Sequence, residues 1–113
     1  MRAVNRTTGR ILAGKVLLAE TLWSRMRGLL GRDALPQAEG LLIRPCCGVH
    51  TFFMKFPIDV VFLDGGNRVI AAAVNLKPYR MTRIVRASRS VLELAAGTVD
   101  ASGTRTGNEV IIG

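Results

Sequence analysis

The stretch RPCCGVHTFFMKFPIDVVFLD, residues 44–64, decides the fold class, because aromatic and β-branched residues dominate it. These residue types favour strands over helices, and we expect strands over 49–55 and 58–63. The turn sequence DGGN follows at 64–67 and predicts a hairpin to another strand over 68–75. The centre of the chain is therefore predicted to be a sheet.

Short apolar runs extend this pattern toward both ends of the chain. Further strands are expected over 41–44, 81–86, 91–95 and 109–112. Short N-terminal strands are expected around the turn signals Thr8–Gly9 and Gly14. The stretch GTVDASG, which ends at Gly103, is predicted to form at most one helical turn.

One segment, TLWSRMRGLLGRD (21–33), has helical periodicity. Thr21 can cap its start and Gly31 can supply a left-handed stop, so the segment predicts one main amphipathic helix of about 21–30. The apolar stripe of this helix is Leu22, Met26, Leu29 and Leu30. The predicted class is α+β and β-dominated, with a curved sheet or a sandwich- or barrel-like β core beside that helix.

Length and cysteine spacing limit the class of protein. The chain has 113 residues, which fits one domain over 1–113, and no stretch reaches the ~20 apolar residues of a membrane helix. Cys46 and Cys47 are adjacent, so a relaxed disulfide between them is disfavoured and two free thiols are expected. A cytoplasmic domain with no membrane partner is predicted.

The charge balance is strongly basic, at +8 with 16 Lys and Arg against 8 Asp and Glu. Most of the excess is Arg, which forks onto carboxylates and phosphates and so favours an anionic partner. Four arginines recur at intervals of three: Arg80, Arg83, Arg86 and Arg89. Any RNA or polyanion binding by the Arg80–Arg89 surface is predicted to be weak, non-specific and strongly salt-dependent.

The quoted stretch leaves three interpretations of His50 open. On a strand, His50 would share a face with Phe52, Met54 and Phe56, as a core-edge histidine bonded to a backbone carbonyl. A soft metal ion could instead take Cys46, Cys47, His50 and Met54. A thiol enzyme could use Cys47 as nucleophile, with His50 as base and Asp59 as its orienter.

Two acidic residues raise questions of burial. Asp59 lies between apolar residues, so we expect it to be more than half buried and paired with Lys55 or an Arg of the helix. Glu93, in VLELAAG, is expected to be a surface residue, with a carboxylate aimed at an interior Arg as the alternative.

Three quoted segments, TLWSRMRGLLGRDAL (21–35), EGLLI (39–43) and HTFFMKFPIDVVFLD (50–64), with a late VLELAAG and GNEV, resemble the DUF192 or UPF0127 family. The resemblance covers nearly the whole chain and implies a compact β-dominated domain with one helix. The family has no agreed activity. The matching positions are Arg25, Gly28, Leu29, Arg32, Gly40, Met54, Ile58, Asp59, Phe62, Asp64, Pro78, Glu93, Gly97 and Gly107, and Asn108 stands where the family usually has Asp.

The leading functional hypothesis is a domain that binds a small anionic ligand in a cleft between the helix and the His50–Asp59 strands. The predicted ligand-binding residues are Arg25, Arg32, His50, Met54, Lys55, Asp59 and Glu93. The alternatives are the thiol- or metal-dependent enzyme that uses Cys46, Cys47 and His50, and the weak polyanion binder. No cofactor is predicted, and the sequence leaves open whether any reaction is catalysed.

Overall fold

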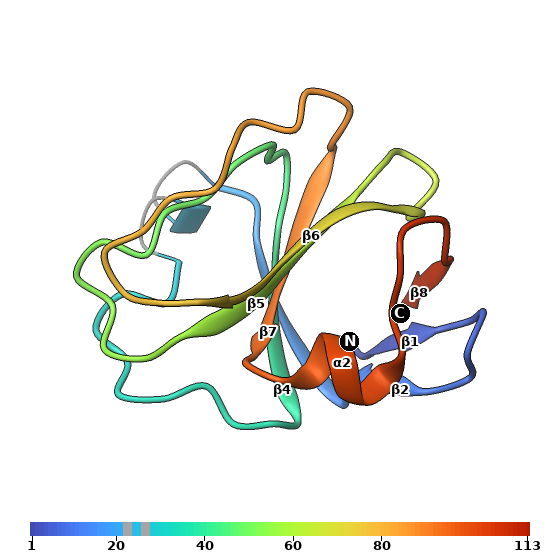
Figure 1. Ribbon diagram of the computed structural model, residues 1–113, viewed down its shortest axis with the longest axis horizontal. Coiled ribbons are helices and arrows are strands. Elements are labelled where there is room, and N and C mark those ends of the chain that lie inside the picture. Colours follow the sequence, from blue (N-terminus) through green and yellow to red (C-terminus); the bar gives the residue numbers. More distant parts are fainter. Residues whose placement is uncertain (22–23, 26–27) are drawn as a thin grey trace.

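The computed structural model describes residues 1–21, 24–25 and 28–113 (Figure 1). Its strands form two sheets with a short helix, so the predicted β-dominated α+β class is confirmed. The elements are β1 (Ala3–Asn5), β2 (Ile11–Ala13), β3 (Lys15–Ala19), β4 (Glu39–Ile43), β5 (Ile58–Leu63), β6 (Val69–Leu76), β7 (Ser90–Ala95), α2 (Thr98–Ser102) and β8 (Val110–Ile112).

The small sheet has the strand order β2-β1-β8, and both pairs are antiparallel. It joins the first strand to the last, with Ala3 opposite Ile112. Arg2 and Gly113 exchange two backbone hydrogen bonds of 3.0 Å, which brings the two ends of the chain together (Figure 1).

The large sheet has the order β3-β4-β7-β5-β6. β3 and β4 are parallel, and the other three pairs are antiparallel. A parallel pair cannot be joined by a tight turn, so residues 20–38 must cross from one end of β3 back to the start of β4. That crossing segment supplies part of the candidate site.

The two central strands of the large sheet, β5 and β7, are buried at every position. This explains their nearly continuous apolar sequence, since strands covered on both faces do not alternate with polar residues. The edge strand β6 is less buried: Val69 is buried, and its other seven positions are intermediate or exposed.

Each face of the large sheet carries its own apolar core. On one face, β1, β2, β8 and α2 pack over residues such as Leu92 and Leu94. On the other face, Val60, Phe62 and Val91 contact loops and the crossing segment. The second face is therefore covered largely by irregular chain, and it is the face that holds the cavity described below.

The predicted helix over 21–30 falls partly outside the described residues, including Leu22 and Met26 of its apolar stripe. In the described part, the Thr21 hydroxyl accepts from the Ser24 amide at 3.0 Å, as the predicted cap requires. Gly31 has φ +83°, in the left-handed region. The other helical segment, α2, is a single short helix that ends at Gly103 with φ +67°, as predicted. No helix in the described ranges is long and apolar enough to cross a bilayer.

The strands expected over 49–55 and 81–86 are wrong, since both segments are loops joined by a single bridge between His50 and Met81. Phe53 has φ +64° and Tyr79 φ +62°, left-handed conformations that break a strand. Side chains of 49–55 consequently do not alternate between two faces. The other predicted strands of the central region form, with Ile58–Leu63 as β5.

Gly40 in β4 lies where another strand approaches closely. A Cβ at this position would lie 3.1 Å from the Glu93 carbonyl oxygen and 3.3 Å from the Ala13 Cβ. We expect Gly40→Ala to lower the free energy of unfolding by about 1–2 kcal/mol, because backbone must shift to admit the methyl group. Denaturant unfolding measures this, with Gly113→Ala as the control because no atom lies within 4 Å of a Cβ there. Equal stabilities would contradict the expected crowding.

Candidate functional site

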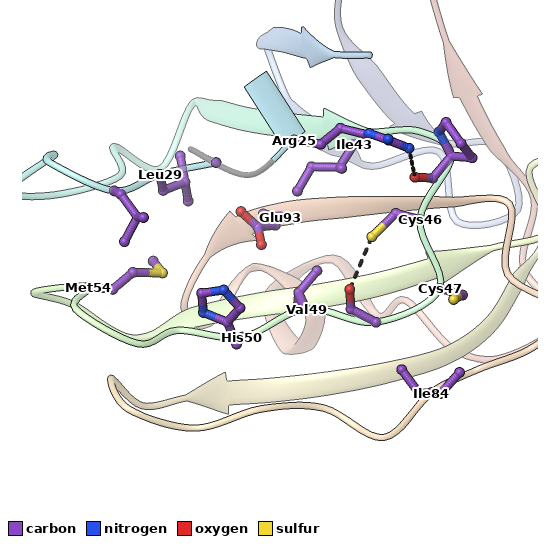
Figure 2. Close-up of a pocket in the computed structure, with 14 residues that line it drawn as sticks. Arg25, Leu29, Ile43, Cys46, Cys47, Val49, His50, Met54, Ile84 and Glu93 are labelled. Carbon is purple, nitrogen blue, oxygen red and sulfur yellow. Dashed lines mark hydrogen bonds between the residues drawn. The ribbon is translucent and has the colours of Figure 1, made fainter. Parts of the chain in front are cut away.

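Glu93 lies at the centre of the large sheet, on its loop-covered face. Within the ladder it is opposite Leu41 of β4 and Val60 of β5, both buried and apolar. Its exposed fraction is 3 %, so the expectation of a surface residue is wrong. Figure 2 shows its carboxyl group directed into the space between the sheet and the covering loops.

Burial governs the protonation of this carboxyl group. Desolvation raises the pKa of Glu93 to about 8, and no charge or hydrogen bond among the described residues offsets it. Arg25 lines the same cavity, but no ion pair joins Glu93 to an Arg among the described residues, so the alternative of a carboxylate aimed at an interior Arg stays a prediction. At pH 7 the group is mostly a neutral carboxylic acid, which can donate as well as accept a hydrogen bond.

Above Glu93 lies a cavity of about 370 Å³, within the size range of small-molecule sites. The crossing segment forms one wall and the loop before His50 forms another (Figure 2). Most lining side chains are apolar, with a few polar groups between them. The lining residues are Arg25, Gly28, Leu29, Leu30, Ile43, Pro45, Cys46, Cys47, Gly48, Val49, His50, Met54, Ile84 and Glu93.

Arg25 brings a positive charge to this cavity. Its Nη1 donates to the Pro45 carbonyl oxygen at 3.1 Å, which fixes the guanidinium against the opposite wall (Figure 2). Its Nε is buried and has no hydrogen-bond partner among the described residues. A buried donor without an acceptor is costly, so an acceptor from a ligand would be favoured there.

Both cysteines are free thiols. The Cys46 thiol donates to the Gly48 carbonyl oxygen at 3.2 Å, and Cys47 is set apart from it (Figure 2). Burial raises the pKa of Cys46, Glu93 adds to the rise, and the Gly48 hydrogen bond and Arg25 oppose it. A raised pKa keeps the thiol protonated, which works against nucleophilic chemistry at Cys46.

His50 lies at the cavity mouth and is exposed, so its interpretation as a core-edge histidine is wrong. Its Nδ1 accepts from the Phe52 amide at 3.2 Å, and its ring stacks on Phe52 with centroids 5.2 Å apart. No group of three His, Cys, Asp or Glu side chains converges as a metal site within the described ranges. The metal hypothesis on Cys46, Cys47, His50 and Met54 thus gains no support from geometry.

Asp59 faces the opposite side of the sheet, toward α2. It is 1 % exposed, which confirms the expected burial. Its predicted partner is wrong, because its carboxylate accepts backbone amides: Oδ1 from Asn75 (2.8 Å), and Oδ2 from Gly97 (3.1 Å) and Val99 (2.9 Å). Asp59 therefore ties β5 to β6 and to the start of α2, and it does not orient His50.

The structure brings together four of the seven predicted ligand-binding residues, namely Arg25, His50, Met54 and Glu93. Arg32 and Lys55 do not line the cavity, and the Lys55 Nζ instead pairs with Asp33 at 3.0 Å on the surface. Sequence reasoning missed the contributions of Ile43 and Ile84, which come from strand and loop positions that carry no chemical signal of their own.

The chain is similar in sequence to proteins whose names state no activity. The model of the DUF192 family, described as "Uncharacterized ACR", matches residues 3–112. A UPF0127 protein of Thermococcus sibiricus is 28 % identical over 111 residues, which cover 95 % of this chain and 71 % of that protein. A UPF0127 protein of Pyrococcus furiosus is 28 % identical over 112 residues, which cover 95 % and 94 %.

A solved structure has the same fold. It is a protein of unknown function from Novosphingobium aromaticivorans DSM 12444, with a TM-score of 0.85 and 26 % sequence identity. The match covers 97 % of this chain and 82 % of that chain. Neither the relatives nor this structure carries a named activity, so function has to be argued from the cavity itself.

Proposed function

The chain belongs to the DUF192 family, whose description names no activity, and from its cavity we propose that it is a cytoplasmic domain that binds a small anionic ligand. The ligand has an apolar body, which lies against the Leu29, Met54 and Ile84 side chains, and one negatively charged end. Free thiols at Cys46 and Cys47 support the cytoplasmic location.

The observation that carries this proposal is the buried Nε of Arg25, which has no hydrogen-bond partner in the part of the chain that the structure describes. An anionic oxygen would supply the missing acceptor in a charge-assisted hydrogen bond. The carboxyl group of Glu93 does not oppose this below pH 8, because its raised pKa leaves it neutral. Among the residues that the structure describes, Arg25 is then the only Lys or Arg side chain on the cavity wall, and its charge favours an anion there.

A matched series of six-carbon probes tests the charge preference: hexanoate, hexanamide and hexylamine. We expect hexanoate to bind best near pH 6, in the millimolar range or tighter, and hexylamine to bind least. Arg25→Gln should weaken hexanoate binding by roughly 10-fold, since one charge-assisted hydrogen bond is lost. Titration calorimetry measures the three affinities.

Arg6→Gln is the matched control, because Arg6 is exposed in the β1–β2 turn and does not line the cavity. It removes the same charge and should leave hexanoate binding unchanged. Equal binding of hexanoate and hexylamine, or equal losses in the two Arg variants, would count against an anion site at Arg25.

A further inference from the structure

Two loops beside the cavity mouth bring four aromatic rings together on the surface. His50, Phe52 and Phe53 come from the loop before β5, and Tyr79 comes from the loop after β6. Phe53 contacts Tyr79 edge-on with centroids 5.6 Å apart, and Phe52 lies 6.4 Å from Tyr79. We call these four residues the aromatic platform. The sequence does not reveal it, because Tyr79 is distant from the other three in the chain.

Thr51 holds the two loops together. It is fully buried, its amide donates to the Arg80 carbonyl at 2.8 Å, and its carbonyl accepts from the Tyr79 amide at 2.9 Å. Its hydroxyl donates to the Lys77 carbonyl at 2.6 Å and accepts from the Arg80 amide at 2.9 Å. The platform is therefore preorganised by a buried hydrogen-bond network, which lowers the entropy cost of binding.

The platform exposes rings that a stable core would bury. Phe53 is 73 % exposed and Tyr79 is 55 % exposed. Both residues also have left-handed backbone conformations, which bulky side chains adopt only at an energetic cost. Exposure and strain at two contacting residues on separate loops are better explained by a binding role than by packing.

The loop that carries Tyr79 is also strongly basic. Residues 77–89 contain Lys77 and four arginines and no acidic residue. Arg80, Arg83 and Arg86 are exposed, and the Arg80 Nη1 donates to the Tyr79 carbonyl at 3.3 Å. The Arg80 guanidinium is therefore held at the Tyr79 backbone, and Arg83 and Arg86 follow along the same loop. Guanidinium groups are suited to phosphates.

We propose that the aromatic platform and its flanking arginines bind single-stranded nucleic acid without sequence preference. Bases would stack on Phe53 and Tyr79, and the phosphates would contact Arg80, Arg83 and Arg86. This combination of π-faces with a positive surface is the one that single-strand binders use, and it recognises every base. The proposal concerns the outer surface. His50 also lines the cavity, but Phe53 and Tyr79, on which the bases would stack, do not.

An anionic membrane is the other partner that exposed rings and basic residues suggest. Two features favour nucleic acid. The flanking charges of 79–89 are all Arg, and the edge-on contact of Phe53 with Tyr79 leaves a broad ring face free for stacking. The test must therefore distinguish binding to nucleic acid from binding to anionic vesicles.

The test uses the full chain and a fluorescein-labelled oligo(dT) of about ten nucleotides, a length within the range that one small domain covers. Fluorescence anisotropy at low salt should give a dissociation constant in the micromolar range, which rises steeply with salt. Phe53→Ala and Tyr79→Ala should each weaken binding by roughly 10-fold. Arg83→Gln should reduce the salt slope by about 1.

Two controls separate stacking from charge. Ile11→Ala removes an equally exposed apolar side chain from the small sheet, and it should leave binding unchanged. An abasic oligonucleotide of the same length keeps the phosphates and should bind roughly 10-fold more weakly than oligo(dT). Circular dichroism melting confirms that each variant is folded.

Three results would overturn the proposal. These are equal binding of the abasic strand and oligo(dT), no loss in the folded Phe53→Ala and Tyr79→Ala variants, or preferential binding to phosphatidylglycerol vesicles over oligo(dT). Loss of hexanoate binding in the cavity would not bear on it, because neither Phe53 nor Tyr79 lines the cavity.

Discussion

Replacing Asp59 with asparagine is expected to lower the free energy of unfolding by about 3 kcal/mol, because the side chain accepts backbone amides at both oxygens. An asparagine keeps only one acceptor oxygen. Its amide nitrogen must face either the Asn75 amide or the two amides at the start of α2, so donors meet donors in a buried site. The melting temperature should fall by roughly 10 °C or more.

Two variants distinguish this explanation from the ion pair that the sequence predicts. Asp100→Asn removes an exposed carboxylate from α2 itself and should cost no more than about 0.5 kcal/mol. Lys55→Gln removes the predicted partner and should also have little effect, because the Lys55–Asp33 pair is exposed. A loss in Lys55→Gln as large as that in Asp59→Asn would restore the ion-pair explanation.

The second large effect is a loss of stability as the pH rises, and its source is Glu93. The folded state holds the Glu93 proton to about pH 8, whereas the unfolded carboxyl group releases it near 4.5. Between these values the folded state binds one more proton, so this contribution to stability falls with rising pH and levels off above about pH 8. We expect the contribution to fall by an amount on the order of 5 kcal/mol across this window.

Urea unfolding of the wild type and of Glu93→Gln, measured from about pH 5 to pH 9, checks this result. The difference between the two curves isolates Glu93, because every other titrating group is common to both proteins. At pH 9, Glu93→Gln should be more stable than the wild type. Glu93→Leu, which also has no ionisable group at this position, should show the same dependence of stability on pH as Glu93→Gln. Parallel curves for wild type and Glu93→Gln would mean that Glu93 ionises at its ordinary pKa.

Much of the large sheet could be predicted from local sequence. The run at 58–63 and the DGGN turn specify β5, the hairpin and β6, because β-branched residues and turn residues act within a few positions. The loops at 49–55 and 81–86 have the same composition as strands but are not strands. The two loops are joined by hydrogen bonds of the Thr51 backbone and by the bridge between His50 and Met81. This is a tertiary arrangement that no local pattern encodes.

The candidate site was less predictable, and Glu93 shows why. A carboxylate is usually exposed, so a lone Glu favours the surface. The missed signal is that Val91, Leu92, Leu94 and Ala95 are apolar on both faces of the strand, which is typical of a central strand. The partners of Asp59 could not be predicted, because they are backbone amides brought from residues 75, 97 and 99 by the fold.

The pairing of β1 with β8 has a consequence for synthesis of the chain on the ribosome. β1 is synthesised before β8, and its hairpin with β2 can form at once. The other edge of β1 can pair only after residues 110–112 have been synthesised. Until that final strand leaves the exit tunnel, the nascent protein carries an open strand edge, and such edges recruit other chains. The small sheet can therefore close only after translation of its last strand, which makes it a late step of folding.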